Sequence, residues 1–134
     1  KLPFVVKGVL SVQDAVKSLE TGAKGIIVSH HHGIMRYAVP PLMMLSEIVK
    51  AVGGKITIFV DCCIESGMDA FKCLALGAEG VCVGRAIMDP LKEKGADGVS
   101  EKINSITDEL RGAMARTGFG MVEEIDDSVI HLWK

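Results

Sequence analysis

Short apolar runs alternate with segments of helical spacing along the chain. Four runs rich in β-branched residues have the length and composition of buried strands. Apolar positions recur every three or four residues after Ser11, Pro40 and Ser66, which predicts amphipathic helices there, and a longer helix is predicted over about residues 99–115. The order of strand and helix is typical of a parallel α/β sheet. The predicted strands cover residues 4–6, 26–28, 56–60 and 81–83.

An internal repeat supports this division of the chain. Residues 14–25 align with residues 69–80 without a gap, and seven of the twelve positions are identical. Each copy runs from a helical pattern into an apolar run, which indicates a repeated helix-then-strand unit. Strands that are joined by helices must be parallel. Four such units predict half of a (β/α)8 TIM-barrel type fold. The alternative is a small open doubly wound sheet, whose G-x-G-x-x-G motif is absent.

Composition narrows the class of protein. The chain has 134 residues, 49% hydrophobic content and a formal net charge of −2, so we expect one globular unit over residues 1–134. This balance excludes a basic nucleic-acid binder and a disordered tail. No apolar run approaches the about 20 residues that cross a bilayer, so we expect no membrane contact and a cytoplasmic location. Lys1 stands almost directly before the first strand, so we also expect a fragment of a longer polypeptide.

Polar and charged residues follow each predicted strand. Parallel strands bring their carboxyl ends to one rim, which is where barrel enzymes keep their active sites. Histidine exchanges protons near neutral pH, so a loop that carries three of them is the expected place of chemistry. Consecutive histidines are poor metal ligands, and we expect no metal. The four sets are Lys7, then Ser29 with His30, His31 and His32, then Asp61 with Cys62 and Cys63, and finally Gly84 with Arg85.

The third and fourth sets have the features of a phosphate site. Backbone N–H groups over residues 62–67 and at Gly84 can donate to an anion, and the Arg85 guanidinium adds a charged fork of donors. The alternative for Gly84 and Arg85 is a plain turn with a solvated arginine.

These motifs, in this order and spacing, resemble the FMN-dependent α-hydroxy-acid oxidase and dehydrogenase family. The resemblance covers roughly residues 4–118 and includes Lys7-Gly8, residues 25–31, residues 59–61, residues 69–78 and Gly84-Arg85. It implies that the chain is the C-terminal half of the family's barrel. It also implies FMN as the cofactor and oxidation of a small 2-hydroxy acid to the 2-oxo product.

The resemblance assigns roles to four residues at the strand ends. His31 falls on the catalytic base that removes a substrate proton. Lys7 falls near flavin N1 and O2, Ser29 on a hydroxyl that contacts the flavin, and Asp61 on a carboxylate that orders the cofactor. The alternatives are a structural loop histidine and an ordinary lysine at a strand end.

The phosphate loop departs from the family pattern. Gly84 and Arg85 match the family's phosphate turn. Cys62 and Cys63 stand where the family has a pair of glycines, and Glu65 replaces an arginine. A carboxylate repels a phosphate unless it points away, so we expect Glu65 to face solvent.

The substrate loop departs as well. The family's serine-asparagine-histidine-glycine-glycine run is here residues 29–33, with histidine in place of the asparagine and of one glycine. Ile34 replaces the arginine that clamps the substrate carboxylate, and an isoleucine makes no ion pair. Arg36 is a hypothetical substitute in substrate binding.

Two further functions stay open. One is a non-catalytic half-barrel that binds a phosphate or FMN or acts as an interaction module, and the other is an enzyme of the flavin-dependent isopentenyl-diphosphate isomerase type. Half a barrel would expose two parallel sheet edges, which invites pairing. We therefore expect, besides a small-molecule substrate, a missing N-terminal barrel half or self-association through those edges.

Overall fold

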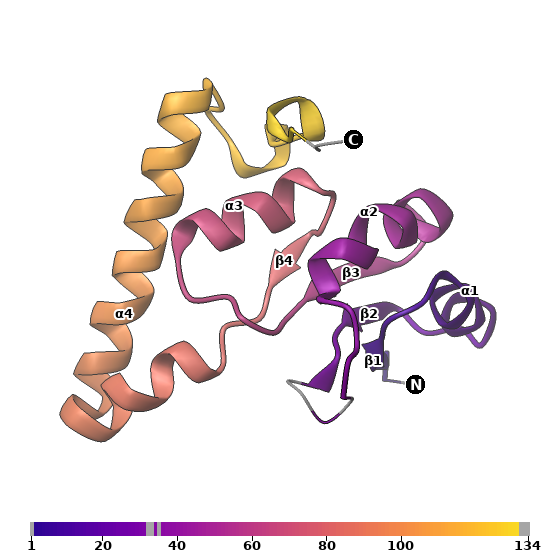
Figure 1. Ribbon diagram of the computed structural model, residues 1–134, viewed down its shortest axis with the longest axis horizontal. Helices are drawn as coiled ribbons and strands as arrows, with labels where there is room; N and C mark the ends of the chain where they lie inside the picture. Colours follow the sequence, from indigo (N-terminus) through magenta and orange to yellow (C-terminus); the bar gives the residue numbers. More distant parts are fainter. Residues whose placement is uncertain (1, 32–33, 35, 132–134) are drawn as a thin grey trace.

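The computed structural model describes residues 2–31, 34 and 36–131. Strands and helices alternate from the N-terminus, as the apolar pattern predicts (Figure 1). The elements are β1 (Val5–Val9), α1 (Val12–Glu20), β2 (Gly25–Val28), α2 (Pro41–Val52), β3 (Thr57–Val60), α3 (Gly67–Ala75), β4 (Gly80–Val81) and α4 (Met88–Thr117), with 3-10 turns η2 (Arg85–Ile87), η3 (Val122–Glu124) and η4 (Asp127–Val129).

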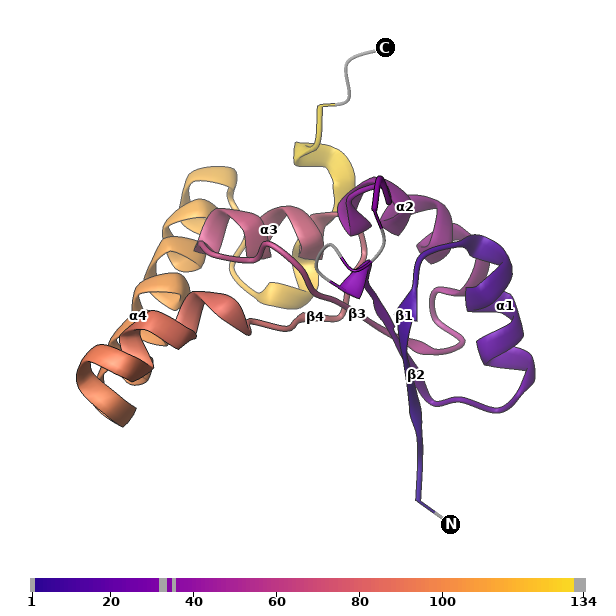
Figure 2. The same ribbon diagram turned by 60° about the horizontal axis from the view of Figure 1, so that its bottom comes forward.

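All four strands form one parallel sheet in the order β1-β2-β3-β4. The register pairs Ile26 with Ile58 and Val28 with Val60, so these four side chains lie on one face. Lys7, Ile27 and Phe59 form a row on the opposite face, where Ile27 and Phe59 are half-buried. Figure 2 shows the first three helices beside the sheet.

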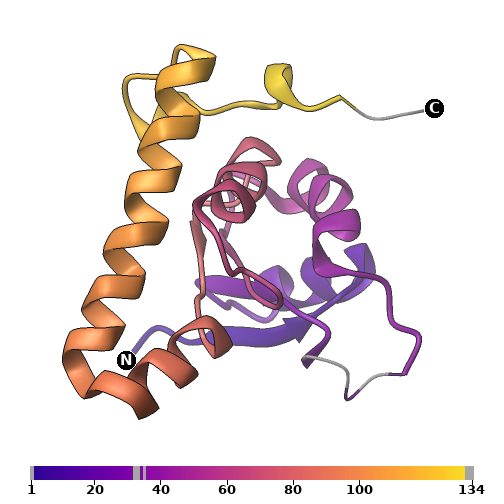
Figure 3. The ribbon, with the colours of Figure 1, turned by 60° about the vertical axis from the view of Figure 1, so that its left-hand side comes forward.

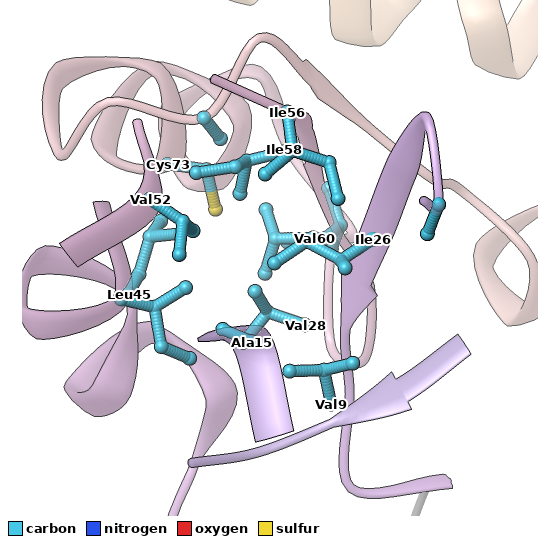
Figure 4. Close-up of a cluster of buried hydrophobic side chains, with 14 residues drawn as sticks. Val9, Ala15, Ile26, Val28, Leu45, Val52, Ile56, Ile58, Val60 and Cys73 are labelled. Atoms are coloured by element: carbon cyan, nitrogen blue, oxygen red, sulfur yellow. The ribbon is translucent and has the colours of Figure 1, made fainter. Parts of the chain in front are cut away.

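The main core fills the space between the sheet and these helices. Strand residues on the buried face meet Ala15 of α1, Leu45 of α2 and Cys73 of α3 in one cluster (Figure 4). Leu45 is fully buried, as are Ile26 and Val28. Burying such side chains is the main favourable term for the fold. The helices therefore cover the same face of the sheet.

Local sequence signals fix the helix starts. The Ser11 hydroxyl accepts from the backbone N–H of Asp14 and caps α1. Ser66 and Asp69 form a reciprocal capping box at α3. Pro41 occupies the first turn of α2, where its missing N–H costs nothing. The predicted starts of these three helices are confirmed.

Three predicted elements differ from the structure. The first strand was expected over residues 4–6 but covers Val5–Val9, because its pairing with β2 continues to Val9, so Lys7 lies within the strand and not after it. The fourth strand was expected over residues 81–83 but covers only Gly80–Val81, because this edge strand pairs on one side and the chain then turns at Gly84. The last helix was expected over about residues 99–115, whereas α4 begins at Met88 and bends at Gly95, whose φ is +61° (Figure 3). Because Gly95 interrupts the helix and few apolar residues precede it, the sequence pattern does not predict the part of α4 before residue 99.

Helix α4 packs against α3, and the chain after it returns to α3. Phe71 and Leu74 of α3, Met114 of α4 and Ile125 form a second core cluster. None of the described helices combines the length and the apolar character needed to cross a membrane.

The contact between α3 and α4 depends on Gly67. A Cβ built there would lie 2.3 Å from the Leu110 backbone N and 2.4 Å from the Ile106 carbonyl O, and neither backbone atom can move aside alone. We expect Gly67→Ala to lower the free energy of unfolding by about 1–3 kcal/mol, measured by urea unfolding of the intact protein.

Gly112→Ala on α4 is the matched control. A Cβ there meets only the flexible Arg116 side chain, at 3.2 Å, and alanine favours the helix by up to about 1 kcal/mol. Equal effects of the two substitutions would contradict the close approach at Gly67.

Candidate functional site

Four side chains link the ends of β1, β2 and β3. Lys7 Nζ lies 2.6 Å from Asp61 Oδ2 and donates to Ser29 Oγ at 3.1 Å. The Cys62 thiol donates to Asp61 Oδ1 at 2.9 Å, and its sulfur lies 3.5 Å from Ser29 Oγ. Of the residues that were predicted to meet at the strand ends, these four are in contact.

The sheet register holds these ends level. Backbone pairing continues one residue beyond each strand, from Ser29 N to Val9 O at 3.0 Å and from Asp61 N to Val28 O at 3.2 Å. Adjacent strand ends cannot slip without breaking these bonds. The sheet therefore sets the positions of Ser29 and Asp61.

A cavity of about 350 Å³ opens beside this network. Its lining includes two cations, Lys7 and Arg85, and among described residues Arg85 makes no ion pair. Glu65 is exposed, as expected, yet it also lines the cavity. Other lining residues are Asp61, Cys62, Cys63, Ile64, Cys82, Val83, Gly84 and Ala86.

Cys62 and Cys63 share an unusual backbone conformation. Their φ angles are +71° and +59°, in the left-handed region that favours glycine. A glycine pair is what the family resemblance implies at these positions. The turn is retained here with two side chains, and the Cys62 thiol takes part in the network.

The backbone donors after this turn are already in use. The N–H groups of Glu65 and Ser66 donate to the Asp69 carboxylate at 3.1 Å and 3.0 Å. Gly67 N–H donates to Glu109 Oε2 at 2.8 Å. The prediction that residues 62–67 offer their N–H groups to a phosphate is therefore wrong for residues 65–67.

His31 joins the network through its main chain. Its N–H donates to Ser29 Oγ at 3.1 Å, its φ is +52°, and the residue is exposed. His32 and Gly33, which continue the predicted loop, lie outside the described residues. Ile34 is 82% exposed, and Arg36 is exposed and absent from the described lining of the cavity.

Cys82 belongs to the site although no sequence signal indicates it. It stands in an apolar run that was interpreted as strand, but β4 ends at Val81 and Cys82 lines the cavity. Burial raises the pKa of its thiol. Among the described residues, no group of three His, Cys, Asp or Glu side chains is arranged to hold a metal ion.

Asp61 is the anionic centre of the network. Burial raises the pKa of its carboxyl, but hydrogen bonds from Cys62 and Lys7 and the charge of Lys7 outweigh burial, so the pKa falls below its ordinary 3.8. Because the carboxyl has a lower pKa in the folded than in the unfolded protein, its ionised form stabilises the fold at any pH above the unfolded-state pKa. This contribution is lost as the pH falls from the unfolded-state pKa through the folded-state pKa.

We therefore expect Asp61→Asn to flatten the loss of stability between about pH 5 and pH 2, as followed by urea unfolding. Asp97→Asn on the exposed surface of α4 is the control and should leave the curve unchanged. An unaltered pH dependence in Asp61→Asn would contradict the ion pair with Lys7.

Residues 1–132 match the family described as FMN-dependent dehydrogenase. The chain belongs to this family. The match confirms the family to which the motifs at the strand ends were assigned, whereas the roles of individual residues stay predictions.

The family members that the chain resembles are longer proteins. 4-Hydroxymandelate oxidase of Amycolatopsis orientalis is 46% identical over 118 residues, 87% of this chain and 33% of that protein. L-lactate oxidase of Nostoc sp. is 42% identical over 132 residues, 98% of this chain and 36% of that protein. Glycolate oxidase of Spinacia oleracea is 42% identical over 130 residues, 96% of this chain and 35% of that protein. The chain thus spans about a third of these relatives.

Solved structures of the family have the same arrangement of strands and helices. A mandelate oxidase with benzoyl-formic acid has a TM-score of 0.91 at 43% identity, covering 95% of this chain and 38% of that chain. A mandelate oxidase with a monooxide FMN adduct gives the same score and identity and covers 41% of that chain. These neighbours are TIM barrels, so this family member is a partial (β/α)8 barrel, which confirms the predicted fold class.

Proposed function

We propose that this chain forms the proton-transfer and phosphate-binding part of an FMN-dependent enzyme that oxidises a small 2-hydroxy acid to the 2-oxo acid. One observation carries the proposal: the buried Ser29 hydroxyl accepts from both Lys7 Nζ and the His31 N–H. A cation and a candidate base are thereby fixed next to each other. The names of the relatives, among them glycolate, L-lactate and 4-hydroxymandelate oxidases, support this substrate class.

The cavity fits a phosphate-bearing cofactor such as FMN. Arg85 supplies a charged donor that pairs with no described residue, and Lys7 supplies a second cation. A Cβ built on Gly84 meets no heavy atom within 4 Å, so backbone there is open to a close approach. We assign cofactor binding to Lys7, Ser29, Asp61, Cys62, Cys63, Gly84 and Arg85.

Each of the chain's own groups has a distinct task in this reaction. When bound, FMN supplies the electron acceptor. The His31 imidazole takes a proton from the substrate, which a histidine does efficiently near neutral pH. The Lys7 ammonium stabilises negative charge that develops at the site, and Asp61 and Ser29 keep it in place. Arg36 is the proposed partner of the substrate carboxylate.

The partial barrel implies a partner for the sheet. Lys7, Ile27 and Phe59 lie on the face opposite the helices, and in the described part of the chain β1 and β4 are edge strands. We propose that further barrel strands, from an N-terminal half or a second copy, cover this face and complete the site. A cytoplasmic location also stays a prediction.

A second function is favoured by two residues. Ile34 offers no charge to a substrate carboxylate, and Glu65 brings a negative charge to the cavity. Ile34 favours a half-barrel that binds FMN or another phosphate compound without oxidising a hydroxy acid, and Glu65, whose charge repels a phosphate, favours an interaction module. An isomerase of isopentenyl diphosphate is a further alternative.

Absorbance of the purified intact protein tests these functions. We expect flavin bands, and we expect glycolate, L-lactate or L-mandelate to bleach them without oxygen. Flavin bands that no hydroxy acid bleaches would overturn the oxidase and favour the second function. Isomerisation of isopentenyl diphosphate would identify the isomerase, and a lack of flavin bands after loading with FMN would contradict cofactor binding.

A further inference from the structure

The end of β1 contains a bulge at Gly8. Lys7 pairs with Ile27 and Val9 pairs with Val28, so Gly8 is an extra residue with no partner in β2. Its φ of +95° lies in the region that favours glycine. Bulges of this kind bend a strand and redirect its side chains, often beside active sites.

The imidazole of His31 occupies the space that a side chain at position 8 would need. A Cβ built on Gly8 would lie 2.1 Å from His31 Nε2 and 3.0 Å from both Cδ2 and Cε1. Three ring atoms are therefore in reach, and the Nε2 edge of the ring faces Gly8. Any L side chain at this position would displace the ring.

A second contact holds His31 through its main chain. The His31 N–H donates to Ser29 Oγ, and the same oxygen accepts from Lys7 Nζ. Lys7 directly precedes the bulge, so one irregularity in β1 sets both the lysine that reaches Ser29 and the surface on which the imidazole rests.

We propose that Gly8 is a positioning residue for His31: because the bulge carries no side chain, the imidazole of the proposed base packs directly against the end of β1 and is held in one orientation there. This inference rests on the proposed function in its catalytic part only, since the contact between Gly8 and the ring is a property of the fold.

The test compares Gly8→Ala with Gly22→Ala in the intact, flavin-loaded protein. Gly22 lies between α1 and β2, its φ is +87°, and a Cβ there meets nothing within 4 Å. The two substitutions therefore impose similar backbone strain, but only the first displaces a ring. Both are also made in a His31→Ala background, and melting temperatures are measured for all variants.

We expect Gly8→Ala to lower Tm by roughly 3–8 °C more than Gly22→Ala when His31 is present, and by the same amount as Gly22→Ala when His31 is alanine. We also expect kcat to fall at least about tenfold with KM little changed, and the acidic limb of the kcat profile to shift. Gly22→Ala should leave kcat, KM and the pH profile of kcat unchanged.

If Gly8→Ala lowers Tm equally with His31 present and with His31→Ala, the proposal that Gly8 positions the His31 ring is overturned. If Gly8→Ala alone fails to fold, folding of the double variant with His31→Ala supports the proposal, and failure of both overturns it. An unchanged kcat and pH profile alongside the expected Tm pattern would overturn the catalytic part. If the protein oxidises no hydroxy acid, the proposed function fails, yet the Tm comparison still tests the contact.

Discussion

Replacing His31 with glutamine is expected to lower kcat by about 10²–10⁴-fold while the flavin stays bound. Glutamine keeps a polar side chain of similar length but does not exchange protons near neutral pH. Among the described residues the cavity lining does not include His31, so the cofactor contacts should survive the change. Steady-state rates and anaerobic bleaching by a 2-hydroxy acid measure the effect, and absorbance gives the flavin content.

His131→Gln is the control for this experiment. His131 lines a separate pocket formed by α2, α3 and the chain after α4, and we expect wild-type rates from it. Bleaching at the wild-type rate in His31→Gln would exclude His31 as the base. Loss of flavin from the same variant would instead make His31 a binding residue.

Arg85→Met is expected to weaken FMN binding by about 10–150-fold, the equivalent of one charge-assisted hydrogen bond. Arg85 lines the cavity beside Gly84 and pairs with no described acidic residue, so its charge is available to a phosphate. Methionine retains much of the side chain's length and removes the guanidinium. Titration of the flavin-free intact protein with FMN gives Kd, and riboflavin, which lacks the phosphate, should lose little affinity.

Arg111→Met is the matched substitution outside the site. Arg111 is exposed on α4, and its Nη1 lies 3.1 Å from Asp108 Oδ1. Such an exposed ion pair contributes little to the stability of the fold. FMN affinity should equal that of the wild type. If Arg85→Met weakens FMN and riboflavin equally, the residue does not contact the phosphate.

Features that depend on nearby residues could be predicted from the sequence. Ser11 and Ser66 cap helices through residues three positions later, and Pro41 opens α2. The ends of parallel strands meet at one rim by geometry alone, which is why Lys7 and Asp61 were expected together and are found 2.6 Å apart.

Features that depend on distant residues could not be predicted. The Gly67 N–H donates to the Glu109 carboxylate, 42 residues away in the sequence. No local pattern indicates that this donor is unavailable to a phosphate. The contact of His31 with Gly8 requires a bulge that only the pairing with β2 reveals. The bend at Gly95 likewise depends on a backbone angle that glycine permits but does not require.

The order of the strands across the sheet has a consequence for synthesis of the protein. Among the described strands, each one after β1 pairs with the strand that precedes it along the chain, so its neighbour is already made as the polypeptide leaves the ribosome. Contacts between consecutive units keep loop closure short and favour rapid folding. The sheet therefore grows at one edge as each new strand is added. If translation pauses, the strand made last has an unpaired edge, and that edge is where aggregation would begin.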